Sequence, residues 1–558
     1  MAQEKYDNNW IMGYPPNLPS ENFGGFKFNF NEEQLRIEYF STKCHANEAA
    51  VLSSPSGKLL AYSEGCRLYN GNHEIMSNGD SLAFGQIWES YCDIIGYPGT
   101  QHHLLLPWPD DSTKAVLFYL KIHDNNITSA LQYAIISFDN SNTLGYVTSK
   151  DQTLIETETT ALLTATKHAN GRDWWILLPE RNSNRFFISL LEPNGVTVVD
   201  TQAIGDHVNP SQQASQAVFT PNGQKFIRFE PTNGLDIFDF DRCSGQLFNP
   251  LESGPLSDPI LNAGGVACSI DSKYLYVSNR NFLYQFDLGS DDILLSSELI
   301  GTYDGYLDPF PTSLYHMLLA PDGKIYMFSS NGVQSGHVID HPERKGTLCD
   351  FKQHVVSFPA HNKIGSPAMP YFRLGPLDNS ICDTLGIDNV PVAYFKYTPD
   401  SVSYLRLNIT NLSYFEPESF NWDFGDGQMS SVESPKFVLY EVEGEYEICL
   451  DVANQYGSST YCQIVNVSDS ITDVLPPVKD EFEILPNPFY TTITLRCIGD
   501  ASGAEIEIFT VEGQQVRKEK IVSNYHAIDL VDLNQGIFIY TIMKDLKIIQ
   551  KGKLIKVN

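Results

Sequence analysis

A strand–turn–strand pattern recurs along the first part of the chain, and it constrains the fold more than any other feature. Its clearest copies are Val218–Phe226, Ala267–Leu275 and Leu318–Tyr326, each an apolar stretch, a turn of Pro, Asn, Asp, Ser or Gly residues, and an alternating stretch. Turn marks at residues 56, 111, 170, 222, 271 and 322 lie 55, 59, 52, 49 and 51 residues apart. A repeat of about 50 residues made of short strands indicates small antiparallel sheets that stack on one another.

Stacked small sheets close most economically into a ring, because one twisted sheet cannot cover both of its own faces. The sequence therefore predicts an all-β fold in which residues 1–378 form a seven-bladed β-propeller, with six or eight blades and a β-sandwich array as alternatives. We expect Gly25–Phe30 and Leu35–Phe40 to combine with Ser366–Arg373 into the seventh blade. The repeats resemble the YVTN and WD40-like bacterial propellers, a resemblance that implies a scaffold and no particular activity.

A second pattern starts after an expected linker at 379–389. It contains the run Trp422, Asp423, Phe424, Gly425, Asp426 and Gly427, followed by Pro435, Tyr440 and Tyr446. Strand alternation places Trp422 and Phe424 in a core, while the glycines permit a tight turn with positive φ. The two aspartates of the run can accept hydrogen bonds from local backbone amides. This run resembles a PKD domain, an immunoglobulin-like β-sandwich, which we expect over residues 390–468.

Ten cysteines and the absence of a CxxC pair favour an oxidising compartment over a cytosolic protein with buried thiols. If Asn454–Gly457 is a hairpin turn, Cys449 and Cys462 face each other on adjacent strands, within bonding reach. This register predicts a disulfide. Further hypotheses are the pairs Cys243–Cys268 and Cys349–Cys382, and pairings among Cys44, Cys66 and Cys92.

A third unit, expected to be a small β-sandwich over residues 482–558, follows a linker at 469–481. It resembles the type A C-terminal sorting domain of the type IX secretion system. The residues that carry the resemblance are Pro486, Asn487, Pro488, Gly513, Gly536, Lys553 and Lys556. The resemblance implies that they are recognised by the secretion machinery of a Gram-negative bacterium of the Bacteroidota, which exports such proteins to the outer-membrane surface or the exterior. Because no apolar leader opens the chain, we interpret it as a mature sequence without its signal peptide, with Met1 added for expression.

The charge of the chain argues against nucleic-acid binding, and its hydropathy argues against a transmembrane helix. The 37 basic and 68 acidic residues give a net charge of −31, which repels a phosphate backbone and disfavours nucleic-acid binding. No run of 18 or more apolar residues occurs, so no transmembrane helix is expected.

Catalytic and metal-binding motifs are missing from the sequence: it has no GxSxG, HExxH, SxxK, GxGxxG or P-loop run. We therefore predict no catalytic residues and no cofactor. His73, His102 and His103 are candidate metal ligands, with structural hydrogen bonding as the alternative. Acidic turns such as Asp110-Asp111 and Asp291-Asp292 could bind Ca²⁺, with solvated carboxylates as the alternative.

Three β modules without a catalytic constellation favour a secreted or cell-surface binding or adhesion protein rather than an enzyme. Its propeller and PKD domain would then contact an extracellular protein or polysaccharide. Two alternatives stay open: a propeller-based hydrolase, lactonase-like or carbohydrate-active, and a structural subunit of a surface assembly.

Overall fold

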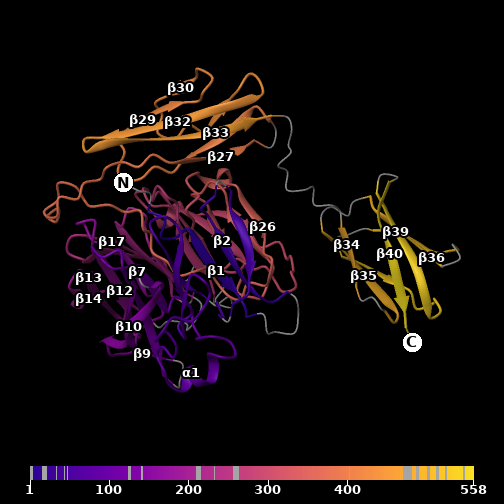
Figure 1. Ribbon diagram of the computed structural model, residues 1–558, viewed down its shortest axis with the longest axis horizontal. Coiled ribbons are helices and arrows are strands. Elements are labelled where there is room, and N and C mark those ends of the chain that lie inside the picture. Colours follow the sequence, from indigo (N-terminus) through magenta and orange to yellow (C-terminus); the bar gives the residue numbers. More distant parts are fainter. Residues whose placement is uncertain are drawn as a thin grey trace. The chain divides into compact units, whose positions relative to one another are not determined.

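The computed structural model describes residues 4–15, 22–32, 34–42, 44–46, 48–123, 127–139, 142–208, 215–231, 233–254, 263–400, 403–468, 481–485, 489–498, 503–510, 514–521, 525–544 and 547–557 (Figure 1). Its backbone divides into two compact units. The first unit holds Met1–Glu441 and Glu445–Asn466, and the second holds Val442–Gly444 and Val467–Asn558. Among the described residues, no helix is long and apolar enough to cross a membrane.

The first unit begins with a series of antiparallel sheets, each built from strands that follow one another in the chain (Figure 1). Two sheets have three described strands: β1 (Asn9–Gly13), β2 (Gly25–Asn29) and β3 (Arg36–Phe40), then β4 (Ala50–Ser53), β5 (Leu59–Ser63) and β6 (Leu68–Asn70). A short helix, α1 (Gln86–Tyr91), follows them.

Five further sheets have four strands each. They are β7 (His103–Pro107), β8 (Lys114–Ile122), β9 (Thr128–Asp139) and β10 (Asn142–Ile155); β11 (Thr164–Lys167), β12 (Trp174–Pro179), β13 (Ser183–Glu192) and β14 (Gly195–Val208); β15 (Gln216–Phe219), β16 (Lys225–Glu230), β17 (Gly234–Phe240) and β18 (Leu247–Glu252); β19 (Gly265–Cys268), β20 (Tyr274–Ser278), β21 (Phe282–Asp287) and β22 (Glu298–Thr302); and β23 (Met317–Leu319), β24 (Ile325–Met327), β25 (Ser335–Ile339) and β26 (Phe351–Ser357). Two 3₁₀ turns precede the fourth strands of the last two sheets: η1 (Leu294–Ser296) lies between β21 and β22, and η2 (Gly346–Cys349) lies between β25 and β26.

Apolar clusters between neighbouring sheets close these sheets into a ring. Each cluster draws buried side chains from sheets that follow one another, as in the cluster shared by β15–β18 and β19–β22. The last sheet packs against the first in the same way. Trp10 of β1 is fully buried there, with its ring 5.7 Å from Phe28 and 5.8 Å from Tyr326 of β24. The all-β propeller is therefore confirmed, and every sheet buries both faces against neighbours.

The expectation for residues 366–373 is wrong in one respect. The stretches at 25–30 and 35–40 do pair with each other, but their third strand is β1. Residues 366–373 lie against the next sheet instead, where Ala368 forms a parallel bridge with Ala50 and its N–H donates to the Ala49 carbonyl (3.1 Å). The short run Asn9–Gly13 between turn residues carried too weak a strand pattern to be recognised.

The PKD sandwich completes the first unit with two sheets. One contains β27 (Phe395–Pro399), β28 (Arg406–Asn411) and β31 (Phe437–Leu439); the other contains β29 (Ser419–Asp423), β30 (Met429–Ser430), β32 (Gly444–Asn454) and β33 (Gly457–Val467). Trp422 and Phe424 are buried, and Gly425 and Gly427 have φ of 80° and 91°. The carboxylates fix the turn as expected: Asp423 accepts from the Gly425 N–H and Asp426 from the Gln428 N–H, both at 2.9 Å.

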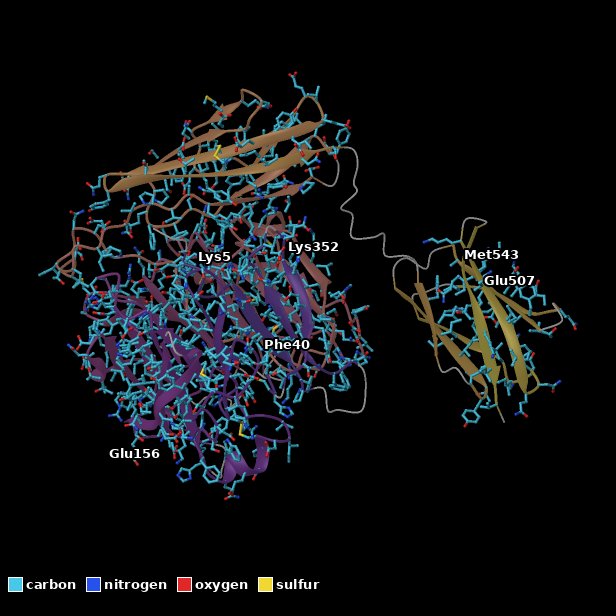
Figure 2. The ribbon with its side chains drawn as sticks, viewed as in Figure 1. Lys5, Phe40, Glu156, Lys352, Glu507 and Met543 are labelled. Atoms are coloured by element: carbon cyan, nitrogen blue, oxygen red, sulfur yellow. A yellow bond between two sulfur atoms is a disulfide. The ribbon has the colours of Figure 1, made fainter. Side chains whose placement is uncertain are left out.

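Three disulfides join described cysteines. Cys449 and Cys462, paired on β32 and β33, have an S–S distance of 2.06 Å (Figure 2). The others are Cys66–Cys92 and Cys243–Cys382. The hypotheses Cys243–Cys268 and Cys349–Cys382 are wrong, because Cys268 and Cys349 are buried free thiols in other parts of the ring. Cys44 is also a buried free thiol.

The second unit is a small β-sandwich around one apolar core. Its strands are β34 (Glu481–Leu485), β35 (Thr492–Ile498) and β38 (Tyr525–Asp529) in one sheet, and β36 (Glu505–Thr510), β37 (Gln515–Lys520), β39 (Gly536–Lys544) and β40 (Lys547–Lys556) in the other.

Candidate functional site

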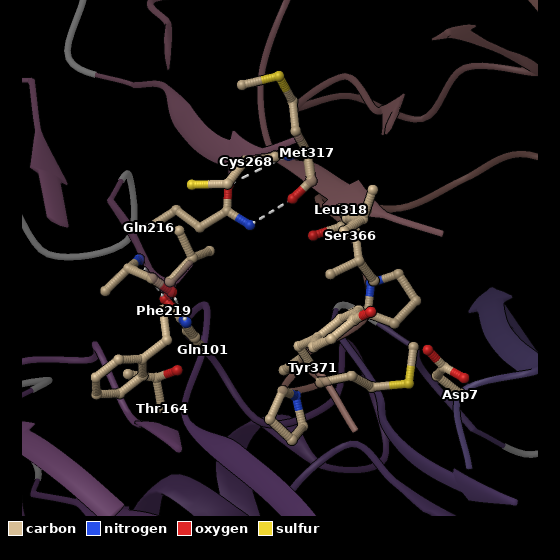
Figure 3. A pocket seen from close by; sticks show the side chains of 18 of the residues that line it. Asp7, Gln101, Thr164, Gln216, Phe219, Cys268, Met317, Leu318, Ser366 and Tyr371 are labelled. Atoms are coloured by element: carbon tan, nitrogen blue, oxygen red, sulfur yellow. Dashed lines mark hydrogen bonds between the residues drawn. The ribbon is translucent and has the colours of Figure 1, made fainter. Parts of the chain in front are cut away.

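The first strands of four sheets line a channel at the centre of the ring, and this channel is nearly full (Figure 3). Side chains from β11, β15, β19 and β23 line it together with residues 366–371, which follow the last sheet. The remaining cavity is about 60 Å³. Since a water molecule needs roughly 10–15 Å³ of such space, the cavity has room for about four to six waters.

Side-chain amides tie the strands together across this channel. The Gln216 amide nitrogen donates to the Met317 carbonyl (2.7 Å), and its oxygen accepts from the Val266 N–H (2.9 Å), as the dashed lines in Figure 3 partly show. Gln101 makes the same pair of bonds with Ala217, donating to its carbonyl and accepting from its N–H. These bonds satisfy edge groups of inner strands that no further strand could pair.

A buried acid–imidazole pair lies at the channel wall. The Glu48 carboxylate contacts His316 Nδ1 and accepts a hydrogen bond from the Gln101 N–H (2.5 Å). Glu48 and His316 are both almost completely buried, and His316 Nε2 has no hydrogen-bond partner. A buried carboxylate and imidazole in contact are the elements of general acid–base chemistry, although the same pair also serves as a structural bridge between sheets.

The structure does not gather the three candidate histidine ligands. His73 stacks on Phe40 with ring centroids 4.0 Å apart. His102 and His103 are buried, and burial lowers the pKa of His102 to about 3 and that of His103 to about 4. Across the described ranges, no group of close metal-ligand atoms includes any of the three.

Two acidic turns named as Ca²⁺ candidates have other partners. Asp111 pairs with Lys114 at 2.8 Å, and Asp292 accepts from the Leu295 N–H at 3.0 Å. One acidic group was not predicted: Asp378 directly precedes the linker 379–389, Asp383 and Asp388 lie in it, and oxygens of the three lie within 4.8 Å of one another. Their recurrence at every fifth position was the available signal.

A second buried titratable cluster lies beside the sheet β4–β6. Glu64 is 1% exposed, and burial raises its pKa to about 7. Lys363 is 8% exposed, and burial lowers its pKa to about 8. The Cys44 thiol donates to Glu64 Oε2 (3.7 Å), and burial raises the pKa of this thiol as well.

The larger hollow lies between the propeller and the PKD sandwich, and we call it the junction cleft. Its lining comes from the turns at 221–224, 240–242 and 270–272, from residues 371–377, from Asn389 and from the loop 413–417. Its cavity of about 300 Å³ is several times larger than that of the channel. Both domains contribute polar and aromatic side chains, so this cleft is a candidate binding site.

The PKD loop that enters the cleft has an unusual backbone. Phe415 and Glu416 both adopt left-handed conformations, with φ of 63° and 50°. Such conformations cost about 1–3 kcal/mol for a residue other than glycine and persist where surrounding contacts hold them. Here the Asn454 side-chain amide donates to the Glu416 carbonyl (3.1 Å) and to the Asn389 carbonyl (2.6 Å). Strained residues cluster at functional sites, and this loop borders the cleft, so the strain supports a functional role of the cleft.

In the second unit, the three described sorting residues lie on the paired strands β39 and β40, where Gly536 is opposite Lys556. Gly536 starts β39, and Lys553 lies on the exposed side of β40. Lys556 is buried, and its ammonium donates to the carbonyls of Leu530 (2.5 Å) and Val531 (3.0 Å), which is a structural role. Pro486, Asn487, Pro488 and Gly513 lie outside the described residues.

Two family models match the chain. The model described as a secretion system C-terminal sorting domain matches residues 483–557, and a PKD domain model matches residues 396–468. The chain is a propeller protein with a PKD domain and a type IX sorting domain. The sorting domain indicates export to the cell surface or the extracellular space, and it implies contact with the secretion machinery.

Solved structures with similar parts include domains of several organisms. The PKD1 domain of the Vibrio cholerae metalloprotease PrtV is 30% identical over 14% of this chain and 98% of that chain (TM-score 0.13). A putative 6-phosphogluconolactonase from Bacteroides uniformis is 12% identical over 66% and 98% (TM-score 0.35), and Saccharomyces cerevisiae Sqt1 is 8% identical over 84% and 100% (TM-score 0.37). No curated protein matches the chain significantly. The propeller itself is evident from the ring of sheets.

Proposed function

We propose that this propeller–PKD protein is an exported extracellular binding protein that takes its ligand in the junction cleft. The observation that supports this most is the difference in volume between the central channel and the junction cleft. The channel, where a propeller can hold a substrate, retains about 60 Å³ and is bridged by amide side chains, whereas the cleft has about 300 Å³. Ligand sites are concave and occur preferentially where domains meet.

The polar lining supports binding rather than chemistry. Asp241, Asp271 and Glu416 line the cleft at separate points from three different loops. A nucleophile–base pair would have to lie within hydrogen-bond reach, and no such contact joins side chains of the described cleft residues.

Binding to whole cells or extracellular matrix tests the proposal directly. The full chain, labelled with a fluorophore, should bind to a target surface, and this binding should saturate as its concentration rises. The double variant Asn222→Trp with Gln224→Trp, which fills the cleft from exposed turn positions, should reduce that binding. Equal binding by the filled variant and the native chain would place the ligand elsewhere. Absence of binding to every surface would contradict the proposal itself.

A hydrolase of the channel is the second candidate, and the Glu48–His316 pair is the observation that favours it. Its test is turnover of a lactone and polysaccharide panel by the full chain. Activity that is lost in Glu48→Gln, with the fold retained, would establish this candidate.

A further inference from the structure

The chemistry of the junction cleft points to a cationic ligand. We propose that the cleft binds lysine or arginine side chains of an extracellular protein partner. This inference rests on the proposed binding function and specifies what the cleft recognises.

The charge balance of the cleft is the first argument. Asp271 and Glu416 are both exposed, both line the cleft, and neither forms an ion pair with another described residue. Burial, followed by the charge of Asp378, raises the pKa of Glu416, and burial raises that of Asp271. The charges of Lys273 on Asp271 and of Arg242 on Glu416 lower these pKa values by less than burial raises them, so both carboxylates still attract further cations.

Only one of the two arginines of the cleft offsets part of this charge: Arg242 lowers the pKa of Glu416, whereas Arg373 is neutralised by Asp7. Arg242 is buried and donates to the carbonyls of Lys167 (3.0 Å), His168 (3.2 Å) and Gly375. Arg373 donates two hydrogen bonds of 2.6 Å to Asp7. The guanidinium groups therefore hold the propeller, the connecting segment and the N-terminus together, and they are not available to bind an anion.

A buried acceptor in the cleft lacks a donor, and this is an independent indication of a ligand. Asn389 is 1% exposed, and its side-chain nitrogen donates to the Pro376 carbonyl (2.9 Å) and to Asp378 (3.0 Å). Its side-chain oxygen has no hydrogen-bond partner. This oxygen lies beside Gly375, where a Cβ atom would lie 1.8 Å from it, and both residues line the cleft. An N–H donor from a ligand or a water would satisfy it.

Aromatic rings complete a site suited to a long cationic side chain. Phe240, Tyr371 and Phe415 line the cleft together with the carboxylates. An aliphatic stem can lie on such rings while its charged end reaches a carboxylate, and cations are also attracted to ring faces. The strained loop contributes one ring, that of Phe415, and one carboxylate, that of Glu416, to the lining. A phosphate, sulfate or uronic acid group would be repelled by the same carboxylates.

Fluorescence anisotropy of the full chain with a fluorescein-labelled Gly-Lys-Gly-Lys-Gly peptide tests the proposal. A chain of net charge −31 attracts any cationic peptide, so the decisive comparison is between variants that change charge equally. The cleft variant is Asp271→Asn with Glu416→Gln. The control variant is Glu74→Gln with Glu156→Gln, which removes two exposed carboxylates outside the cleft; Figure 2 labels Glu156.

We expect the cleft variant to bind the peptide about 5–30-fold more weakly, because two charge pairs are lost. The control variant should change the affinity for the peptide by less than about twofold. Gln224→Glu, which adds a carboxylate at an exposed cleft position, should tighten binding. A Gly-Gln-Gly-Gln-Gly peptide should not bind measurably.

Equal weakening by the cleft and control variants would overturn the proposal, since it would show a general charge effect. Binding of a neutral glucan in the cleft, lost in the cleft variant and insensitive to salt, would overturn it in favour of a carbohydrate ligand. Either outcome leaves the extracellular binding function intact, whereas loss of all surface binding by the native chain would contradict that function instead.

Discussion

The buried imidazole of His103 makes the stability of the propeller depend on pH, and its contribution can be isolated with one substitution. His103 is 1% exposed at the start of β7, where Nε2 contacts the Glu48 carbonyl and Nδ1 has no donor. A neutral ring with its proton on Nε2 satisfies this arrangement, because a carbonyl accepts and cannot donate. Burial accordingly lowers the pKa of His103 from 6.5 to about 4.

The sign and size of the effect follow from this shift. Between pH 6.5 and 4 the unfolded chain binds the proton and the folded chain does not, so the free energy of unfolding falls as the pH is lowered. From pH 7.5 to 4.5 the loss from this one ring is about 2.5 kcal/mol, at 1.36 kcal/mol per pH unit between the two pKa values.

Urea unfolding of the native chain and of His103→Gln, at pH 7.5 and at pH 4.5, measures this loss of unfolding free energy. Glutamine keeps a donor for the Glu48 carbonyl and has no charge to gain, so the stability advantage of the native chain should shrink by about 2.5 kcal/mol at pH 4.5. Glu64, whose pKa is raised to about 7, changes stability in the opposite direction, but it is common to both proteins and cancels in the difference. His123→Gln, at an exposed position, serves as the control. Parallel pH dependences for the native chain and His103→Gln would refute the reasoning.

Four further outcomes are expected. Replacing Cys449 and Cys462 by serine opens a loop with a sequence separation of 13 and should lower PKD stability by about 3 kcal/mol, measured by denaturant titration of oxidised protein. Trp10→Ala should cost about 3–5 kcal/mol, because this ring fills the contact between the first and last sheets; unchanged thermal stability would contradict the closure described. Lys556→Met leaves two carbonyls without their donor and should destabilise the sorting domain by about 1–3 kcal/mol, seen as a lower melting temperature of its transition. Deleting residues 482–558 should abolish export in the native host, and immunoblots of culture medium that still contain the truncated protein would argue against the sorting role.

Local sequence patterns were sufficient to predict the three domains, but they did not predict the contacts between distant segments. The turn around Gly425 was predictable because its aspartates, glycines and aromatic residues each have a local reason to be there. The Cys449–Cys462 pair followed from hairpin register alone. The pairing of Cys243 with Cys382 spans 139 residues, and no local pattern indicates it.

The junction cleft was beyond prediction for the same reason. Its carboxylates at 241, 271 and 416 come from three distant loops, and only the packing of the PKD sandwich brings them to one hollow. Arg242 looks like a surface charge in the sequence, yet it is buried and bonded to backbone carbonyls. The strand β1 was missed because five residues without clear alternation give little pattern to recognise.

The route of residues 366–377 has a mechanical consequence. This stretch leaves the last sheet along the inner wall of the ring, pairs with β4 through Ala368, and passes Arg373, which is clamped by Asp7. When force on the chain from its C-terminal side reaches the propeller, it would therefore act on the contacts at the central channel before it acts on the outer strands of the sheets. Because that load would shear the pairing at Ala368 and the two hydrogen bonds of Arg373 to Asp7 together, the propeller should resist mechanical unfolding from this end.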